Sequence, residues 1–554
     1  MKKKNKKIIK VEHAIRRITI ITLLLAAIIF LITVAPNYVK EANSDKINLI
    51  INNNNITGRL KNDIIIENDI PYLSTADFKI FFDEFLIEDN NSIITTSNTK
   101  TVKIATETNT MNINGANEKL QNNICKKDSN YYLPIKEMAS VYNYDYDYRN
   151  GIVLIDSLNK RFVQTTSSKN QEVKFKATNF SKAIEKIKRG DILTIVQDPQ
   201  KNVDIEVNGY LKVRTQNGNM GYIKETNTMG RNVVRDNLEP NTILGKVRLA
   251  FDYYNQYTKA PSRTTSIDGI NAVSPSFYEL KSDGSLVKNV DQNYINWAHE
   301  NGYKIWPTLS NSSLNNLDAV SRMMQTFESR QKLIDNIIKA LVESEVDGIN
   351  IDFENMYKED KDKYSRFLIE LRPRIKEIGM TMCVDVTEPD GSDTWSLCYD
   401  RNTIGRVADY VIFIGYDQHT AGSTTAGSVA SANWVELNIT KFLGQEGIPK
   451  EKLILSMPFY TRLWREQNGR LTSTVVNMNK VTIPKGVEKV WNEEAKQNYI
   501  EYKQGSSTYK MWIEDEQSIS AKIDLVNKYD LAGGSFWEID RETVGVWKII
   551  NEKM

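Results

Sequence analysis

The residues most able to do chemistry lie in one segment, Asp347–Asn355, which reads Asp-Gly-Ile-Asn-Ile-Asp-Phe-Glu-Asn. Side chains alternate along a β-strand, so Asn350, Asp352 and Glu354 share one face and the apolar residues between them share the other. Polar groups on a buried face are costly unless they satisfy one another or a ligand. Two carboxyl groups on one face, with Cα atoms about 6–7 Å apart, can supply a proton and hold a developing positive charge. An edge strand with one wet face is the alternative interpretation.

A barrel of alternating strands and helices could position these groups. From about Leu244, apolar segments alternate with amphipathic stretches such as Arg330–Glu343 and Lys361–Ile378. Eight candidate strands over roughly 300 residues fit a (β/α)8 TIM barrel, whose active site lies at the carboxyl ends of the strands and whose interior strands have no wet face. A doubly wound sheet would less often reach eight strands. The candidate strands are Val247–Phe251, Ile270–Ser274, Lys304–Leu309, Gly348–Phe353, Thr381–Val386, Tyr410–Ile414, Lys452–Met457 and Gly533–Trp537.

The spacing of Asp347, Asp352 and Glu354 resembles the signature of the family 18 glycoside hydrolases, Asp-x-x-Asp-x-Asp-x-Glu at the end of the fourth barrel strand. Asn350 departs from this signature, because many chitinases have Asp at that position. The resemblance covers roughly residues 244–554. Its specificity comes from matches at several strand ends rather than from one motif.

Three further strand ends carry residues that match the family. Tyr416 and Asp417 follow the sixth candidate strand, and Tyr460 and Arg462 follow the seventh. Trp537 ends the eighth strand, where family members place a tryptophan under the reacting sugar.

The residues around these matches are similar to one branch of the family. Asn350 together with the segments Tyr416–His419 and Tyr460–Trp464 resembles the bacterial spore-cortex and cell-wall N-acetylglucosaminidases. In that branch Src-homology-3-like or other wall-associated modules commonly precede the barrel. The resemblance therefore implies a glycan of the cell wall as substrate.

The resemblance implies a retaining, substrate-assisted glycosidase. In that scheme the 2-acetamido oxygen of the sugar attacks the anomeric carbon, while Glu354 protonates the leaving group and then activates water. Asp352 orients the acetamido N–H, Tyr416 holds the acetamido carbonyl, and Trp537 forms an apolar floor. The implied catalytic residues are Glu354, Asp352 and Tyr416, and the implied substrate-binding residues are Asn350, Asp417, Tyr460, Arg462 and Trp537. No metal or cofactor is required.

The proposed acid needs an unusual pKa. Glu354 must be protonated near neutral pH, which an ordinary pKa of about 4.3 would not allow. Burial and the neighbouring charge of Asp352 are both expected to raise the pKa of Glu354. Asn350 cannot ionise, and we expect its amide to hydrogen-bond Asp352 and to alter the pH profile.

Several other residues keep two interpretations. Asp417 contacts substrate or only forms a turn, and Arg462 binds sugar hydroxyls or lies exposed on a loop. His419 contacts substrate or is incidental, and Trp306 is a stacking wall or part of the core. The segment inserted between strands seven and eight, ending near Trp512, walls the cleft or lies apart from it.

The chain begins with a basic segment and an apolar one. Residues 1–17 hold eight Lys or Arg against Glu12, and residues 18–35 form an apolar run without a charge that would span about 27 Å as a helix. The positive-inside rule places residues 1–17 in the cytoplasm. We therefore expect a single-pass anchor in the cell membrane, with the remainder on the cell-wall side. A cleaved signal, which would make the protein secreted, is the alternative.

Two small domains are expected before the barrel. Residues 45–158 contain two strand–helix–strand copies, and the second resembles the bacterial copper amine oxidase N-terminal-like domain, an α+β module. This stretch contains no His, so no copper chemistry follows. Residues 159–230, with a hairpin over Tyr210–Ile223, suggest a small β-barrel that resembles bacterial Src-homology-3-like modules. Such modules often bind cell-wall material, and a spacer without ligand is the alternative.

Composition argues against nucleic-acid binding, a disulfide framework and a zinc site. The net charge is 72 − 70 = +2, and the chain after residue 17 carries 64 − 69 = −5, which argues against nucleic-acid binding. Three Cys and three His provide neither a disulfide framework nor a dedicated zinc site. No protein partner can be inferred from the sequence.

The function expected from the sequence is a membrane-anchored, exported hydrolase that cleaves N-acetylglucosaminyl linkages in peptidoglycan or a related N-acetylated glycan. A chitinase acting on chitin is one alternative, and a glycan-binding lectin on the same barrel is another. Retention of Glu354, Asp352 and Tyr416 together disfavours the lectin. A wall-scaffolding protein whose front domains matter most is a weaker alternative.

Overall fold

The computed structural model describes residues 19, 20, 22 and 47–554, apart from 199–200, 202, 236–242, 256, 259 and 315. The expected cytoplasmic segment 1–17 lies outside the described residues, as does the expected anchor 18–35 except for three positions. Among the residues that are described, no helix combines the length and apolar character needed to cross a membrane. The chain divides into two compact units, of which the second comprises residues 94–103, 112–117 and 240–554.

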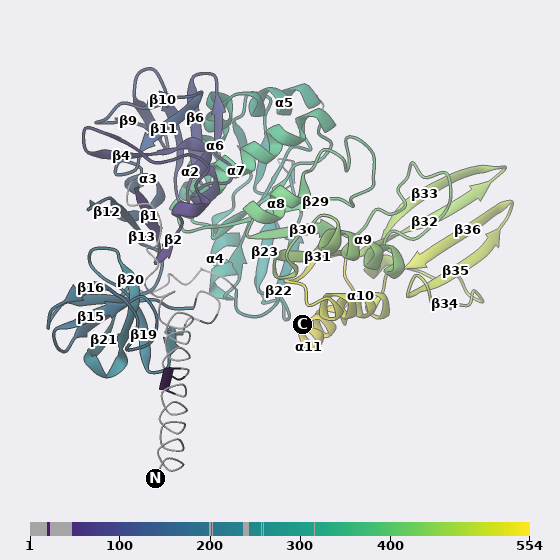
Figure 1. The fold of residues 1–554 in the computed structure, drawn as a ribbon. Coiled ribbons are helices and arrows are strands. Elements are labelled where there is room, and N and C mark those ends of the chain that lie inside the picture. The colour runs from purple at the N-terminus through teal and green to yellow at the C-terminus, as the bar shows by residue number, and fades with distance from the viewer. Residues whose placement is uncertain are drawn as a thin grey trace, which may run out of the picture. The chain divides into compact units, whose positions relative to one another are not determined.

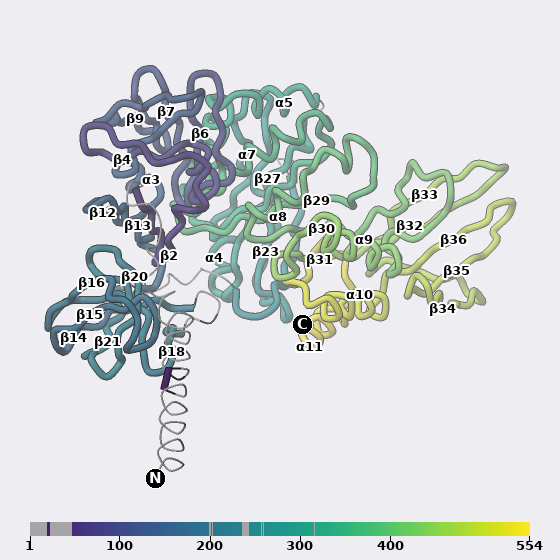
Figure 2. Tube along the Cα trace, viewed as in Figure 1, coloured from purple at the N-terminus to yellow at the C-terminus, as the bar shows by residue number. Residues whose placement is uncertain are grey.

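The second unit contains a closed ring of parallel strands at eight positions (Figure 1). Neighbouring strands pair in parallel around the ring, and the last strand pairs with both the seventh and the first, which closes it. Figure 2 shows a teal part and a yellow part of this unit meeting, where the first and the last strand of the ring pair. In order, the strands are β22 (Val247–Asp252), β23 (Ala272–Pro275), β26 (Lys304–Ile305) with β27 (Thr308–Ser310), β28 (Gly348–Asp352), β29 (Thr381–Val386), β30 (Tyr410–Ile414), β31 (Leu453–Pro458) and β37 (Gly533–Trp537).

The eight predicted strands are therefore all present, and only the third is interrupted. The break falls at Trp306 and Pro307, because proline has no N–H to donate to a neighbouring strand. Pairing continues across the break: the Trp306 N–H donates to Val273 and the Pro307 carbonyl accepts from the Asn350 N–H, both at 2.9 Å. The strand thus keeps its place in the ring.

Helices follow the strands and cover the outside of the ring (Figure 1). Polar caps set where several of them begin: Asn316 caps α5, Thr326 caps α6, and Asp515 caps α10 by accepting hydrogen bonds from the first-turn N–H groups. The helices are α4 (Gln292–Glu300), α5 (Leu317–Gln325), α6 (Phe327–Ser344), α7 (Lys361–Glu377), α8 (Arg401–Val407), α9 (Ala432–Gly444), α10 (Glu516–Lys528) and α11 (Val546–Lys553).

The interior of the ring is filled by apolar side chains from most of its strands. They include Val247, Leu249, Phe251, Ala272, Trp306, Cys383, Tyr410, Ile412 and Ile454. Trp306 is 1% exposed and stacks on Tyr410 with ring centroids 5.5 Å apart. Of its two predicted roles, Trp306 therefore has the core one, and it does not form a wall for a ligand.

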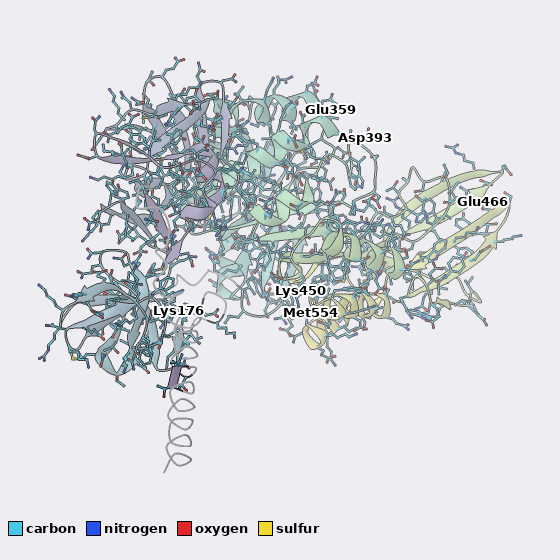
Figure 3. The ribbon with its side chains drawn as sticks, viewed as in Figure 1. Lys176, Glu359, Asp393, Lys450, Glu466 and Met554 are labelled. Atoms are coloured by element: carbon cyan, nitrogen blue, oxygen red, sulfur yellow. The ribbon has the colours of Figure 1, made fainter. Side chains whose placement is uncertain are left out.

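The segment between β31 and α10 forms a separate antiparallel sheet. Its strand order is β33 (Arg470–Asn477), β32 (Tyr460–Gln467), β36 (Ser507–Ile513), β35 (Gln497–Gln504) and β34 (Val490–Asn492). The sheet projects beyond α9 and α10 in Figure 1, and Glu466 marks it in Figure 3. Only Phe459 separates β31 from β32, so Tyr460 and Arg462 lie where this sheet begins.

Both predicted strand–helix–strand copies are present in the front part of the chain. The first runs through β4 (Ile70–Ser74) and α2 (Thr75–Phe81), and its later strand is β6 (Ser92–Thr96). The second comprises β11 (Asn130–Pro134), α3 (Ala139–Tyr142) and β13 (Ile152–Ser157). The leading strands of the two copies pair antiparallel with one another. The likeness to the copper amine oxidase N-terminal-like domain stays a prediction.

An eight-stranded sheet follows, over Phe162–Arg235. It contains the predicted hairpin, formed by β19 (Tyr210–Arg214) and β20 (Met220–Lys224), which pair antiparallel. Its last strand, β21 (Thr228–Arg235), runs beyond the predicted boundary at residue 230. The Src-homology-3-like assignment and the binding of wall material stay predictions.

A fully buried ion pair joins the projecting sheet to α10. The Lys522 ammonium lies 2.9 and 3.0 Å from the two carboxylate oxygens of Glu514, and neither side chain is exposed. Glu514 also accepts from Gln497 on β35 and from Ser518, each at 2.6 Å. Because each buried charge depends on its partner, loss of one leaves the other uncompensated.

Replacing Lys522 with Met should therefore lower the free energy of unfolding by about 3–5 kcal/mol. Thermal unfolding followed by calorimetry would measure the loss. Lys548→Met is the matched control, because the Lys548–Glu552 pair is 79% and 61% exposed and contributes little. Equal unfolding temperatures for the two variants would contradict the assignment of Glu514–Lys522 as a stability-determining pair.

Candidate active site

Strand β28 carries polar groups from one end to the other, and they occupy three different environments. Asp347, just before the strand, pairs with Lys304 at 2.8 Å and His299 at 3.0 Å. Asn350 is fully buried, while Asp352 and Glu354 at the carboxyl end are half-buried. The alternating apolar side chains Ile349, Ile351 and Phe353 are all fully buried. The predicted division of β28 into two faces is confirmed.

Asn350 does not make its predicted hydrogen bond to Asp352. Its amide Nδ2 instead donates to Oδ2 of Asp385 on β29, at 2.8 Å. Asn350 and Asp385 are diagonal neighbours on adjacent strands, about 7–8 Å apart, which two side chains can bridge with one hydrogen bond. The pairing register sets Asn350 beside Cys383, so the next inward position of β29 is Asp385. Asp385 is thus a third carboxyl group that the sequence analysis missed.

The three carboxyl groups all bind protons more tightly than exposed acids do. Burial raises the pKa of Asp352 to about 7. Burial, reinforced by the charges of Asp352 and Asp417, raises the pKa of Glu354 well above its usual range. Burial and the charge of Asp352 do the same to the pKa of Asp385. The expected elevation for Glu354 is therefore present with both predicted causes, burial and the charge of Asp352, and the charge of Asp417 is a further cause that was not predicted.

Two side chains from other elements fix the backbone beside Glu354. Asn311, which follows β27 and is 5% exposed, accepts from the Glu354 N–H at 2.9 Å and donates to the Glu354 carbonyl at 2.8 Å. The Tyr399 hydroxyl donates to the Phe353 carbonyl at 2.8 Å. Asn355 then turns the chain away with a φ of 50°, a conformation that Asn tolerates. These hydrogen bonds fix the backbone of Glu354 at the end of the strand, while its side chain stays half-buried.

Tyr416 faces the three carboxyl groups from the end of β30. Burial raises the pKa of its phenol well above the usual range, and so do the charges of Tyr460, Asp385, Asp352 and Glu354. The ring also meets Tyr460 edge-on, with centroids 6.0 Å apart. Tyr416 is therefore a neutral hydroxyl, available as a hydrogen-bond donor in the middle of the site.

Asp417, Tyr460 and Arg462 form a second polar group next to Tyr416. The Tyr460 hydroxyl donates to Oδ1 of Asp417 at 2.6 Å, and the Arg462 guanidinium lies 3.9 Å from the same oxygen. The Arg462 side chain is 12% exposed, so it is not a free surface arginine. Its Nε is buried without a partner. Asp417 has a φ of 61°, so it also shapes the turn after β30.

Trp537 ends β37 as predicted and is half-buried. Its indole packs against Phe251 and Tyr253, with ring centroids 5.4 and 5.9 Å away. The indole also packs against the apolar core inside the ring of strands. Its carbonyl accepts from the Phe459 N–H at 2.7 Å, and the bond to Glu538 is cis. The indole thus gives an apolar surface at the same end of the barrel as Asp352.

His419 serves the loop rather than a ligand. Its Nδ1 lies 2.9 Å from the Ser428 carbonyl, and its ring covers Gly427 so closely that a Cβ there would meet ring atoms at 2.4–2.5 Å. The Gly427 carbonyl accepts from the Trp464 indole at 2.8 Å. The loop after β30 is therefore clamped to the projecting sheet.

The residues that the sequence analysis missed differ in how visible they are. Asp385 is the one charged residue in Thr381–Val386 and lies two positions from Cys383, on the inward face, which was a usable signal. Asn311 and Tyr399 act through hydrogen bonds to the backbone of a distant segment, which no local pattern reveals.

A family model described as Glycosyl hydrolases family 18 matches residues 250–542, which is more than half of the chain. The chain belongs to this family of glycosidases.

Its relatives include proteins named as a glycosylase and as a lytic enzyme. The uncharacterized glycosylase YvbX of Bacillus subtilis is 27% identical over 300 residues, spanning 51% of this chain and 84% of the relative. The cortical fragment-lytic enzyme of Bacillus cereus is 21% identical over 319 residues, spanning 54% of this chain and 73% of the relative. The crystal structure of the Bacillus cereus spore cortex-lytic enzyme SleL aligns with a TM-score of 0.48 at 17% identity, over 60% of this chain and 79% of that one.

Replacing Asn311 with Ala should lower kcat for glycoside hydrolysis about 10- to 100-fold, because the Glu354 backbone loses both of its lateral hydrogen bonds and the carboxyl group shifts. KM should change little. Steady-state kinetics would measure both constants. Asn527→Ala removes a similar bond, to the Lys553 carbonyl, and serves as the control. An unchanged kcat in the Asn311 variant would show that these two hydrogen bonds do not position Glu354.

Proposed function

We propose that this chain is an exported enzyme that hydrolyses N-acetylglucosaminyl linkages in peptidoglycan or a related N-acetylated glycan, with retention of configuration. The observation that carries the proposal is the pair Asp352 and Glu354. Both carboxyl groups lie at the end of β28, point to the same face and have raised pKa values. Family membership supplies the reaction class, and this geometry supports the mechanism.

The geometry of the pair favours assistance by the substrate. Two carboxyl groups on one face of one strand cannot attack the anomeric carbon from one side and protonate the leaving oxygen from the other. The 2-acetamido oxygen of the sugar serves as nucleophile instead. It forms a bond to the anomeric carbon as the glycosidic bond breaks, and the departing oxygen takes the Glu354 proton. Water then attacks the oxazolinium ion and returns a proton to Glu354.

The other residues stabilise this sequence of steps. Asp352 accepts a hydrogen bond from the acetamido N–H and balances the positive charge of the oxazolinium ion. Tyr416, which stays protonated, donates to the acetamido carbonyl. Trp537 supplies the apolar floor beneath the ring, and Asp417, Tyr460 and Arg462 bind its hydroxyl groups.

The choice of peptidoglycan rests on the relatives and on the start of the sequence. The relative from Bacillus cereus is named as lytic for cortical fragments. The apolar run 18–35 would hold the enzyme in the cell membrane with its barrel on the wall side. Chitin carries the same acetamido group and is the alternative substrate. Mass spectrometry of products released from purified sacculi would separate the two and would also report endo or exo cleavage.

Glu354→Gln should abolish hydrolysis while leaving glycan binding intact, because the amide keeps the size and polarity of the side chain but cannot donate the required proton. Release of reducing ends measures hydrolysis, and calorimetry with a chito-oligosaccharide measures binding. Glu359→Gln, an exposed position labelled in Figure 3, is the matched control and should behave as the parent protein. Undiminished turnover by the Glu354 variant would disprove the role of Glu354, and tight binding without turnover by the parent protein would indicate a lectin.

Glycosides that lack the 2-acetamido group should be cut at least about 10³-fold more slowly than their N-acetylated counterparts, since the nucleophile is then absent. Competing hydrolysis of paired glucosyl and N-acetylglucosaminyl substrates measures the ratio. Equal rates would refute assistance by the substrate and leave only the family assignment.

A further inference from the structure

Three buried oxygen atoms on β28 and β29 have no hydrogen-bond partner. They are Oδ1 of Asn350, Oδ1 of Asp352 and Oδ1 of Asp385. Asn350 and Asp385 are 0% and 4% exposed. An unpartnered buried oxygen costs free energy, and two carboxylates facing one another cost more. A proton held between two carboxyl oxygens removes both costs.

The register of the strands brings the two carboxyl groups together. β28 and β29 pair in parallel, with Asn350 beside Cys383 and Ile351 beside Val384. Asp352 and Asp385 are therefore the next neighbours across the sheet, at a strand separation of about 4.8 Å. The Asn350 amide donates its hydrogen bond to Oδ2 of Asp385. Oδ1 of Asp385 has no other partner and is therefore available to Asp352.

The titratable groups that interact with Asp385 among the described residues are all acids. They are Asp352 and Glu354 from β28 and its end, Cys383 from β29, Tyr416 from the end of β30, and Tyr364 from α7. None of these groups supplies a positive charge, so each lost proton adds repulsion. The site therefore favours a state in which Asp352 and Asp385 keep one proton between them.

We propose that Asp385 shares one proton with Asp352, and that Asn350 is the neutral bridge that orients Asp385 for this exchange. The inference rests on the proposed function. In the free enzyme the proton lies between the two carboxyl groups. When positive charge develops on the sugar, the proton moves fully onto Asp385 and leaves Asp352 as the anion that balances the oxazolinium ion. It returns when that ion is hydrolysed, so no net proton is consumed. Asp385 is a positioning residue, because it acts through Asp352.

Asp385→Asn tests the proposal, because the amide keeps the shape and still accepts from Asn350 but cannot titrate. In the singly protonated pair the Asp385 O–H donates a charge-assisted hydrogen bond to the Asp352 carboxylate, and the amide of the variant replaces it with a weaker donor, so the pKa of Asp352 rises. The acid limb of the kcat/KM profile should therefore move to higher pH by on the order of one pH unit. The exchange variant Asn350→Asp/Asp385→Asn puts the carboxyl group back on the other side of the same hydrogen bond and should move the profile back toward that of the parent protein. Asp393→Asn, on the surface in Figure 3, should leave it unmoved.

An unmoved profile in the Asp385 variant, or a displaced one that the exchange variant does not correct, would overturn the proposal. If the Asp385 variant fails to fold, as judged by calorimetry, Asn350→Asp replaces it: a second acid beside Asp385 should shift both limbs to higher pH, and no shift would refute the shared proton.

Failure of the proposed function has a different signature. A parent protein that cleaves no N-acetylated glycan disproves that function. The shared proton is then tested without substrate, by infrared titration of the protonated carboxyl band. This band should diminish in the Asp385 variant, and an unaltered band would overturn the proposal.

Discussion

Burial of acidic groups at the carboxyl ends of two adjacent strands is the constraint on which the site depends. A carboxylate inside a ring of strands loses most of its hydration, so Asp352, Asp385 and Glu354 hold protons at pH values where exposed acids release them. An acid that stays protonated near neutrality is what departure of a sugar oxygen requires. Asn350 fits beneath these groups because its amide adds a hydrogen bond without adding a charge. The same burial that costs stability therefore creates the reactive proton.

Periodicity in the sequence was sufficient to predict the ring of strands. Strands buried on both faces appear as short apolar runs, and the bounds of β29, β30 and β37 were predicted to the residue. Periodicity describes one strand at a time, however. The partner of Asn350 depends on the register between strands, which tertiary packing sets, and for that reason Asp385 was missed and the predicted bond to Asp352 was wrong.

Other parts of the site depend on contacts that span long stretches of sequence. Asn311 reaches the backbone of Glu354, and its type and position give no local signal. Trp306 was compatible with a ligand wall or with the core, and only its complete burial against Tyr410 distinguishes the two. Residue type thus identified the groups that carry chemistry, whereas the groups that hold them in place emerged only from the folded chain.

The short junction between barrel and projecting sheet has a mechanical consequence. Only one residue separates β31 from β32, and the first side chain of β32, Tyr460, donates a 2.6 Å hydrogen bond to Asp417. A second residue of the same strand, Trp464, donates to the Gly427 carbonyl in the loop that follows β30. Two residues of the projecting sheet therefore hold Asp417 and this loop, so a displacement of the sheet would move both of them with it.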